Sequence, residues 1–335
     1  MDAFRVAIIG CGRVFSLHAS ALSDITGAEI IAVCDIKEKI AKLRASECKC
    51  SYYTDYKKMI LAEKPDVVHI CLPHYLHGEA SIFAMENGCH VLCEKPMEIS
   101  VASAQKMIQT SESQNKTLGV IFQNRYNHAS KSVKRLFESG VLGNILGGRV
   151  SLWWSRNAEY YKSSAWKGRI KYEGGGVVVS QAVHVLDLLL WFVGKVPYSV
   201  NANINNFDHD KIEVEDSAYG VIRFDNGALI HFDFTNNYSY NAPMEIEIHC
   251  QNGIVKMVGD KAEVIYKDGR VDAFSAEDFQ ANGEYSSTKS YWIASHFLQT
   301  KDFYHSLAQG DSQFMNLESV FTTTKVMCAI LKSVR

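Results

Sequence analysis

Hydrophobic and polar positions follow one pattern through roughly the first 125 residues of this chain. Short apolar runs rich in β-branched residues are separated by longer stretches with helical spacing. Strands that are apolar throughout are buried on both faces, so this alternation predicts a doubly wound parallel sheet in an α/β fold. The predicted strands occupy residues 4–10, 29–35, 66–73, 90–96 and 117–124.

After about residue 196 the pattern changes to short strands separated by turns. Asp-Asn-Gly, Gln-Asn-Gly and Lys-Asp-Gly stand between the runs, which predicts antiparallel hairpins in a largely antiparallel open sheet. The predicted strands are 198–204, 216–224, 228–234, 244–250, 253–259 and 262–267. Helices are expected at 295–310 and 317–334, with the last helix packing back on the first domain.

Size and composition narrow the class of protein. A chain of 335 residues predicts two domains, a Rossmann dinucleotide-binding domain at 1–124 and an α+β domain at 125–335 for substrate binding and oligomerisation. The net charge of −2 favours neither nucleic acid nor membrane as a partner. No signal-peptide layout begins the chain, and the nine cysteines lack zinc-type spacing, so we expect a cytoplasmic protein with reduced thiols and no metal.

The loop after the first predicted strand reads Gly-Cys-Gly-Arg-Val-Phe and carries a dinucleotide-binding pattern. Gly10 allows a tight turn, and Gly12 lets the backbone approach a pyrophosphate at a helix N-terminus. Phe15 fills the third glycine position, which weakens the pattern. Asp35 ends the next strand about 20 residues on, where a carboxylate binds a ribose 2′-hydroxyl, so NAD is predicted and NADP less favoured.

Other strand ends carry polar groups as well, and ligands of such sheets bind at the carboxyl ends of strands. Pro96 holds Lys95 extended, so its ammonium could stabilise a substrate alkoxide, while Glu94 could accept a hydrogen bond from the nicotinamide ribose. His77 could face the cofactor. The predicted cofactor-binding residues are Gly10, Gly12, Arg13, Val14, Asp35, Ile36, Leu72, Pro73, His77, Glu94, Lys95 and Gln123.

A histidine follows three glycines in the second half. On a regular helix, Ser180, His184 and Asp187 would share one face, and residues 174–176 would let backbone and ligand approach closely. A histidine in such a place is by default a satisfied core residue. A neighbouring cofactor instead favours His184 as the acid–base.

The stretch before this helix is rich in aromatic rings and cations. Aromatic faces suit the C–H faces of a sugar ring, and arginine suits its hydroxyl or carboxylate groups. Core packing is the alternative, above all for Trp153 and Trp154. The predicted substrate-binding residues are Arg125, Arg156, Tyr160, Tyr161, Trp166, Gln181, His184 and Asp187.

Six segments together resemble the Gfo/Idh/MocA oxidoreductases, the glucose–fructose oxidoreductase and inositol dehydrogenase family. They are GCGRV, AVCD, PDVVHICLPHYLH, HVLCEKP, QNRYN and GGGVVVSQAVHVLD. Ser180 and Ala182 depart from the usual pattern and bring the chain closer to the nucleotide-sugar 3-dehydrogenase branch. The resemblance implies a catalytic pair of Lys95 and His184, a sugar hydroxyl on Gln181, and a homodimer or homotetramer built through the C-terminal sheet.

Taken together, the residues and the resemblance predict an NAD-dependent dehydrogenase. Hydride would pass between nicotinamide and a ring hydroxyl or ketone of a sugar, polyol or sugar derivative, with His184 taking the hydroxyl proton and Lys95 steadying the oxygen. Two alternatives stay open at this point. One is a redox-assisted NAD-dependent lyase or glycosidase, and the other is a non-catalytic dinucleotide-binding sensor of the same fold.

Overall fold

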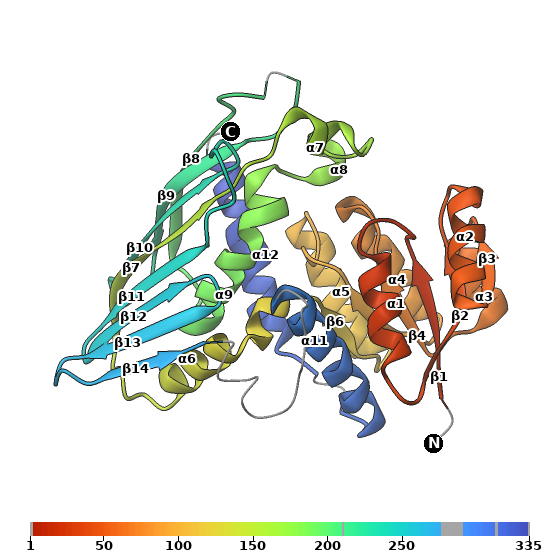
Figure 1. The fold of residues 1–335 in the computed structure, drawn as a ribbon, viewed down its shortest axis with the longest axis horizontal. Helices are drawn as coiled ribbons and strands as arrows, with labels where there is room; N and C mark the ends of the chain where they lie inside the picture. The colour runs from red at the N-terminus through yellow and green to blue at the C-terminus, as the bar shows by residue number, and fades with distance from the viewer. Residues whose placement is uncertain (1–2, 210, 276–290, 312–313, 334–335) are drawn as a thin grey trace. The chain divides into compact units, whose positions relative to one another are not determined.

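The computed structural model describes residues 3–209, 211–275, 291–311 and 314–333. The chain divides into two compact units, which are described separately (Figure 1). The first unit consists of Met1–Gln123 and Ile293–Phe321, and the second of Asn124–Trp292 and Thr322–Arg335. The division after residue 123 lies beside the expected boundary, but residues 293–321 belong to the first unit and not to the second domain, where we expected them.

The first unit is built on a six-stranded sheet in the order β3-β2-β1-β4-β5-β6, with every pair of neighbours parallel. This confirms the predicted doubly wound sheet. The strand at 51–53 was not predicted, because it is only three residues long and mostly exposed, so it has no buried apolar run. The strands are β1 (Phe4–Ile9), β2 (Ala28–Cys34), β3 (Ser51–Tyr53), β4 (Val67–Ile70), β5 (His90–Cys93) and β6 (Leu118–Val120).

Helices connect these strands, and one of them comes from the far end of the chain. Phe303 of α11 is fully buried and belongs to the same core cluster as Val6, Ile8 and Leu92. Its apolar stripe completes the first core, which is the physical reason that the unit reaches beyond residue 123. The helices are α1 (Phe15–Ser23), α2 (Glu38–Cys48), α3 (Tyr56–Glu63), α4 (His77–Glu86), α5 (Val101–Ser113) and α11 (Tyr291–Ala308), with a short 3₁₀ turn at His74–Leu76.

The second unit contains an eight-stranded sheet in the order β14-β13-β12-β11-β7-β10-β9-β8. All neighbours are antiparallel except β7 and β10, which confirms a largely antiparallel sheet. Two of its strands, 145–153 and 271–274, were not predicted. The strands are β7 (Ile145–Trp153), β8 (Ser199–Asn205), β9 (Ser217–Arg223), β10 (Leu229–Thr235), β11 (Glu245–Cys250), β12 (Gly253–Val258), β13 (Lys261–Tyr266) and β14 (Val271–Phe274).

Along the strands of this sheet one face is buried and the other is exposed. In β10, Ile230, Phe232 and Phe234 are buried, whereas His231 and Asp233 between them are exposed. Alternation of this kind is expected for a sheet that packs helices on one side only. The helices of the unit are α6 (His128–Glu138), α7 (Ala158–Lys162), α8 (Ile170–Glu173), α9 (Val183–Val193) and the part of α12 (Leu317–Lys332) that begins at Thr322. The 3₁₀ turn Gln123–Tyr126 begins with the last residue of the first segment of unit one and continues into this unit.

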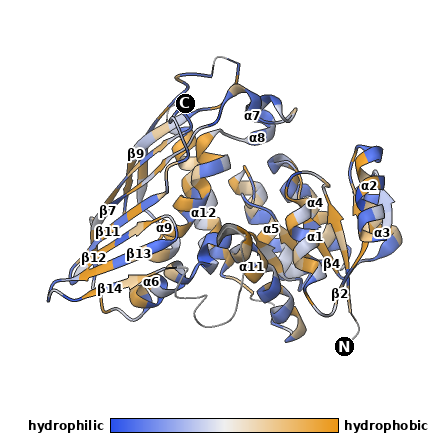
Figure 2. Cartoon of the chain, in the orientation of Figure 1, coloured by the Kyte–Doolittle hydropathy of each residue, from blue (hydrophilic) through white to orange (hydrophobic). Residues whose placement is uncertain are grey.

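Helix α9 is the apolar centre of the second unit and lies against β7 and β11. Figure 2 shows it as one of the most hydrophobic elements of the unit. Within the described residues, the helical stretch Ile170–Val193 is long and apolar enough to cross a bilayer, but 78% of its most apolar window is buried inside the fold. Burial of that extent is typical of a core helix.

Candidate active site

The glycine loop after β1 has two glycines with different roles. Gly10 has φ +98°, and a Cβ at this position would overlap the carbonyl oxygen of Cys71 after β4. A Cβ on Gly12, by contrast, would meet nothing within 4 Å, so this part of the loop is open. Phe15 begins α1 and is buried in the core, which explains why the third glycine position holds a large side chain. The fold requires Gly10, and Gly12 leaves space for a ligand.

Asp35 after β2 braces this loop. The backbone N–H of Cys11 donates to its Oδ2 at 3.1 Å, and the N–H of Lys37 donates to its Oδ1 at 2.9 Å. Each carboxylate oxygen can accept a second hydrogen bond, so a ribose hydroxyl could still bind there. Of the other residues expected here, Arg13 and Ile36 are exposed and Val14 is half-buried.

The loops after β4 and β5 are tied together by His77. Its Nδ1 lies 2.7 Å from the carbonyl oxygen of Pro96, and its Nε2 lies 2.8 Å from that of Leu72. The side chain is fully buried. We expected His77 to face the cofactor, but the structure occupies both ring nitrogens with carbonyl groups, so this histidine shapes the loops instead. Leu72 and Pro73 are half-buried at the end of β4.

The end of β5 carries the Glu94–Lys95 pair. Glu94 is buried, and its Oε1 lies 3.1 Å from Nε2 of both His18 and His296, while the backbone N–H of Lys95 donates to its Oε2 at 3.3 Å. Lys95 itself is half-buried. After β6, the side-chain oxygen of Gln123 is buried and has no hydrogen-bond partner among the described residues. A bound nucleotide with its many hydroxyl groups could satisfy such an acceptor.

In the second unit, the three glycines before α9 were expected to let a ligand approach the backbone, but the neighbouring chain fills the space at one of them. A Cβ on Gly176 would overlap the carbonyl oxygen of Glu215. The carboxylate of Glu215 accepts hydrogen bonds from the N–H groups of Gly176 at 2.8 Å and Val178 at 3.0 Å. The expectation that these glycines admit a ligand was therefore wrong at Gly176, which admits the neighbouring backbone.

A π-turn at Val178–Ala182 separates residues that a regular helix would align. It inserts an extra residue into the turn, a feature often found at functional sites. Ser180 donates to Glu173 Oε1 at 2.5 Å, and the N–H of Gly168 donates to the other oxygen of Glu173 at 2.5 Å. His184 is half-buried in the first turn of α9. The π-turn therefore takes Ser180 out of the regular helical register expected with His184 and Asp187, which both lie in α9.

Arg125 and Asp187 form a buried ion pair with two parallel hydrogen bonds. Arg125 Nε lies 2.7 Å from Asp187 Oδ2, Nη2 lies 2.6 Å from Oδ1, and the hydroxyl of Thr323 donates to Oδ1 at 3.0 Å. Burial raises the pKa of Asp187, and the guanidinium offsets part of that effect. We expected both side chains at the substrate, but the carboxylate is 1% exposed and satisfied within the unit, so the pair fixes α9.

Four other side chains form a polar network beside α9. Asn236 donates to Gln181 Oε1 at 2.9 Å and to the Tyr161 hydroxyl at 3.2 Å, and Gln181 donates to the Tyr160 hydroxyl at 2.9 Å. Burial raises the pKa of Tyr161, so its phenol stays neutral. Asn236 was not predicted. Its position at the carboxyl end of β10, the same kind of position that identified Asp35 and Lys95, was the signal available in the sequence.

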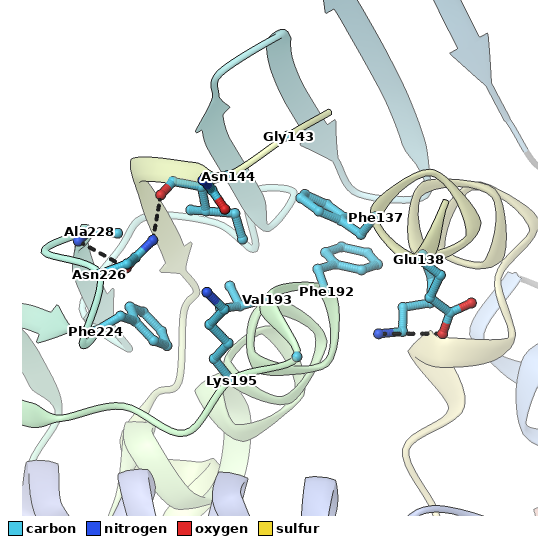
Figure 3. Close-up of a pocket in the computed structure, with 13 residues that line it drawn as sticks. Phe137, Glu138, Gly143, Asn144, Phe192, Val193, Lys195, Phe224, Asn226 and Ala228 are labelled. Atoms are coloured by element: carbon cyan, nitrogen blue, oxygen red, sulfur yellow. Dashed lines mark hydrogen bonds and ion pairs between the residues drawn. The ribbon is translucent and has the colours of Figure 1, made fainter. Parts of the chain in front are cut away.

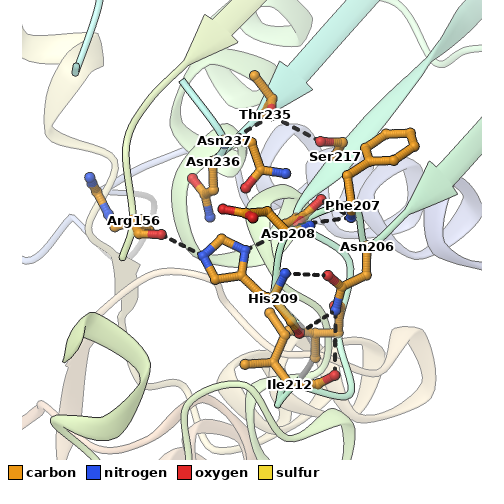
Figure 4. Close-up of polar contacts among 12 residues, drawn as sticks. Arg156, Asn206, Phe207, Asp208, His209, Ile212, Ser217, Thr235, Asn236 and Asn237 are labelled. Carbon is orange, nitrogen blue, oxygen red and sulfur yellow. Dashed lines mark hydrogen bonds and ion pairs between the residues drawn. The ribbon is translucent and has the colours of Figure 1, made fainter. Parts of the chain in front are cut away.

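Arg156 is held at the end of β7 by a histidine–aspartate pair. His209 Nε2 lies 2.6 Å from the Arg156 carbonyl oxygen, and its Nδ1 lies 3.1 Å from Asp216 Oδ2. Figure 4 shows the imidazole facing the Arg156 backbone. The guanidinium lies 4.9 Å from the centre of the Trp154 ring and 5.2 Å from that of Tyr160, distances typical of cation–π contacts. Arg156, Tyr160 and the half-buried Trp166 therefore stay candidates for substrate binding.

Two hollows lie within the second unit. One, of about 490 Å³, has Tyr161 in its wall together with four cationic side chains, Lys162, Lys167, Arg169 and Lys211, and two acidic ones, Asp208 and Glu213. The other, of about 250 Å³, lies at the carboxyl end of α9 among Phe137, Phe192 and Phe224 (Figure 3). His184 is at the opposite end of that helix, so the hollow of Figure 3 is remote from the candidate chemistry.

Comparison with known proteins identifies the family. Residues 4–122 match the oxidoreductase family with an NAD-binding Rossmann fold, and residues 130–256 match the GFO/IDH/MocA C-terminal domain. The chain therefore belongs to the GFO/IDH/MocA oxidoreductases. Its first unit is their NAD-binding domain.

Characterised relatives share most of the chain. It is 32% identical to D-glucoside 3-dehydrogenase of Escherichia coli, covering 68% of both proteins. It is 26% identical to myo-inositol 2-dehydrogenase of Thermotoga maritima, covering 74% of this chain and 73% of that one. The crystal structure of the WlbA dehydrogenase from Bordetella pertussis with NADH and UDP-GlcNAcA has a TM-score of 0.89 at 26% identity, covering 100% of this chain and 96% of that one.

Substitutions of the two glycines in the β1 loop should have different effects, one on stability and the other on cofactor binding. Gly10→Ala places a Cβ against Cys71 at a positive φ and should cost about 2–4 kcal/mol of unfolding free energy. Gly12→Ala should change stability by less than about 0.5 kcal/mol but weaken NAD binding. Urea unfolding and NAD titration measure the two effects. Equal loss of stability in both variants would contradict this division.

Glu215 should make stability depend on pH. Burial raises its pKa from 4.5 to about 7, so the folded state keeps a proton that the unfolded chain loses. Stability from this group is complete below pH 4.5 and falls by roughly 3 kcal/mol as pH rises through 7. Glu215→Gln stays neutral, so urea unfolding at about pH 5 and about pH 8 should differ less than in the parent protein. The exposed acid Glu263, changed to Gln, is the control and should leave the pH dependence intact.

Proposed function

We propose that this protein is an NAD-dependent dehydrogenase that acts on a ring hydroxyl of a sugar, polyol or sugar derivative. The observation that carries the proposal is the carboxyl edge of one parallel sheet. There, open backbone at Gly12, the Asp35 carboxylate, the Glu94–Lys95 pair and the unsatisfied oxygen of Gln123 follow β1, β2, β5 and β6. These groups fit a dinucleotide, whose nicotinamide supplies the hydride acceptor when it is bound.

The proposed chemistry assigns one role to each of two side chains. The Lys95 ammonium donates a hydrogen bond to the substrate oxygen and stabilises negative charge on it. The His184 imidazole accepts the hydroxyl proton as the carbon gives up its hydride. Oxidation therefore leaves a ketone on the substrate and a proton on His184.

The substrate class follows from the second unit and the relatives. The half-buried Tyr160, whose hydroxyl accepts a hydrogen bond from Gln181, and the Arg156 guanidinium offer the ring, the hydroxyl and the cation that a sugar requires. Four cationic side chains and two acids, Asp208 and Glu213, line the larger hollow, and this excess of positive charge favours substrates that carry a phosphate or carboxylate. Relatives named for D-glucoside and myo-inositol support the same class.

Two further properties complete the proposal. Asp35 repels a 2′-phosphate, so NAD is preferred to NADP. The protein is proposed to be cytoplasmic, and to form a homodimer or homotetramer through the exposed face of the eight-stranded sheet, where Trp153, Tyr219 and Val258 are 39%, 47% and 49% exposed.

The catalytic assignment predicts separate losses of turnover and binding. Lys95→Met and His184→Asn should each lower kcat at least about a hundredfold, because each removes a group that acts on the reacting oxygen. NAD affinity should stay within about threefold for His184→Asn. The parent activity is found by following NADH absorbance with a panel of glucosides, inositols, uronic acids, sugar phosphates and nucleotide sugars.

Exposed side chains give matched controls for these variants. Lys58→Met and His305→Asn carry the same chemical changes at exposed positions of α3 and α11 and should keep full activity. Near-normal turnover in Lys95→Met would remove this lysine from its role. Substrate consumption without net NADH would point to the redox-assisted lyase or glycosidase reaction instead.

The proposed oligomer can be tested by substitutions on the exposed face of the eight-stranded sheet. Multi-angle light scattering should give a dimer or tetramer, and Val258→Glu together with Tyr219→Glu should shift it toward smaller species, because two buried charges destabilise an interface. A monomer in the parent protein at micromolar concentration would contradict the proposal.

A further inference from the structure

Three histidines and a tyrosine form a buried cluster with Glu94 inside the first unit. His18 comes from α1, His69 from β4, and His296 and Tyr304 from α11. All five side chains are buried, at 0%, 0%, 3%, 3% and, for Glu94, 8% exposure. Sequence analysis left His18, His69 and Tyr304 without a role, and the proposed reaction uses none of these four partners.

The contacts form a continuous chain of hydrogen bonds. His18 Nε2 and His296 Nε2 each lie 3.1 Å from Glu94 Oε1. His18 Nδ1 lies 2.8 Å from His69 Nδ1, and His69 Nε2 lies 2.9 Å from the Tyr304 hydroxyl. Each contact is short enough for a hydrogen bond, and His18 and His69 use both ring nitrogens.

One arrangement of protons satisfies the whole chain with neutral rings. A carboxylate only accepts, so both Nε2 atoms must carry their hydrogens toward Glu94. His18 Nδ1 is then an acceptor, which makes His69 Nδ1 a donor and His69 Nε2 the acceptor for the Tyr304 hydroxyl. Every donor along the chain points toward Glu94, and bonds aligned in this way polarise and strengthen one another.

The ionisation of each group agrees with this arrangement. Burial alone would raise the pKa of Glu94, but the hydrogen bonds from His18 and His296 hold it well below its usual range. Burial lowers the pKa values of His18 and His69 and raises that of Tyr304, so the rings and the phenol stay neutral. Glu94 therefore stays ionised beside neutral His18, His69 and Tyr304.

A buried charge is costly, and a purely structural cluster would not require one. The charge is located where the sheet presents groups to a ligand, since Glu94 directly follows β5 and precedes Lys95. Oε1 accepts hydrogen bonds from both imidazoles, while Oε2, within the described part of the chain, accepts one at 3.3 Å from the Lys95 N–H. Oε2 is thus the oxygen left for a ligand hydroxyl.

We propose that His18 and His296 are positioning residues that keep Glu94 ionised in one orientation, and that this fixed charge makes the dinucleotide site prefer NAD⁺ to NADH. Oxidised nicotinamide carries a positive charge that reduced nicotinamide lacks, so a nearby carboxylate stabilises the oxidised form selectively. The inference rests on the proposed function, because it takes Glu94 to bind the nicotinamide ribose. It adds that the protein itself biases the redox state of the bound cofactor toward the form that accepts hydride.

The test compares the affinities of both redox forms for the intact protein and variants at neutral pH. Glu94→Gln removes the charge but keeps the shape of the side chain. It should weaken NAD⁺ binding more than NADH binding, so the dissociation constant of NADH divided by that of NAD⁺ should fall about tenfold. His296→Leu removes one donor and should shift the ratio in the same direction. His296→Gln restores an N–H near the Nε2 position and should return the ratio to within about threefold of the parent value.

A matched control lies on the same helix. His305 is exposed on α11, and His305→Leu should leave both affinities unchanged. A thermal melt of each variant separates loss of folding from loss of binding. Unchanged ratios in both Glu94→Gln and His296→Leu, even with lowered melting temperatures, would overturn the inference and leave the cluster a structural element.

Two other outcomes are distinguished by the same samples. His18 Nε2, His296 Nε2 and Glu94 Oε1 lie within 4.8 Å of one another, a spacing that a metal ion could also occupy. A stoichiometric zinc content in the purified protein would overturn the inference, because both Nε2 atoms would then be ligands and not donors. Failure of the parent protein to bind either dinucleotide would instead refute the cofactor assignment of the proposed function.

Discussion

The structure depends on the hydrogen-bond donors that it supplies to carboxylates buried away from water. Among the described residues, the buried acids include Glu94, Glu173, Asp187, Glu215 and Asp216. A buried carboxylate costs several kcal/mol unless donors replace the water it has lost. Each of these acids therefore fixes the segments that supply its donors. Glu173 and Glu215 hold the approach to α9, Asp187 holds the helix itself, and Asp216 holds the end of β7 through His209.

The type of donor decides the charge that each acid carries. Glu215 and Glu94 are both buried, yet their pKa values move in opposite directions. Two backbone N–H groups do not outweigh desolvation at Glu215, whose pKa rises to about 7. Two imidazole donors, one of them at the end of a polarised chain, do outweigh it at Glu94. One fold thus contains a carboxylate that shares its proton near neutral pH and another that stays ionised, and only the second is at the edge where a charged cofactor would bind.

The same principle changes the interpretation of several residues singled out in the sequence. Arg125, Asp187 and His77 had the chemistry of ligand-binding groups, and the structure uses them to satisfy one another or the backbone. Asn236 attracted no attention, yet it connects Gln181 to Tyr161. Residue type alone could not separate these cases, because a polar side chain that binds substrate and one that fixes a loop have the same donors and acceptors. The difference lies in whether a partner from the same chain already occupies them.

The sequence by itself determined the parallel sheet, the hairpins of the second unit and the positions of Gly10, Gly12, Asp35, Glu94 and Lys95 at the ends of strands. These features follow from periodicity and turn residues within a few positions of one another, so a local pattern contains them. Only the tertiary structure decided that α11 completes the first core and that His296 meets Glu94 from 202 residues away. The sequence also did not predict the π-turn that contains Ser180 or the hydrogen bond from Ser180 to Glu173. Contacts of this kind arise when whole elements pack together, and no spacing along the chain records which distant donor a buried carboxylate will meet.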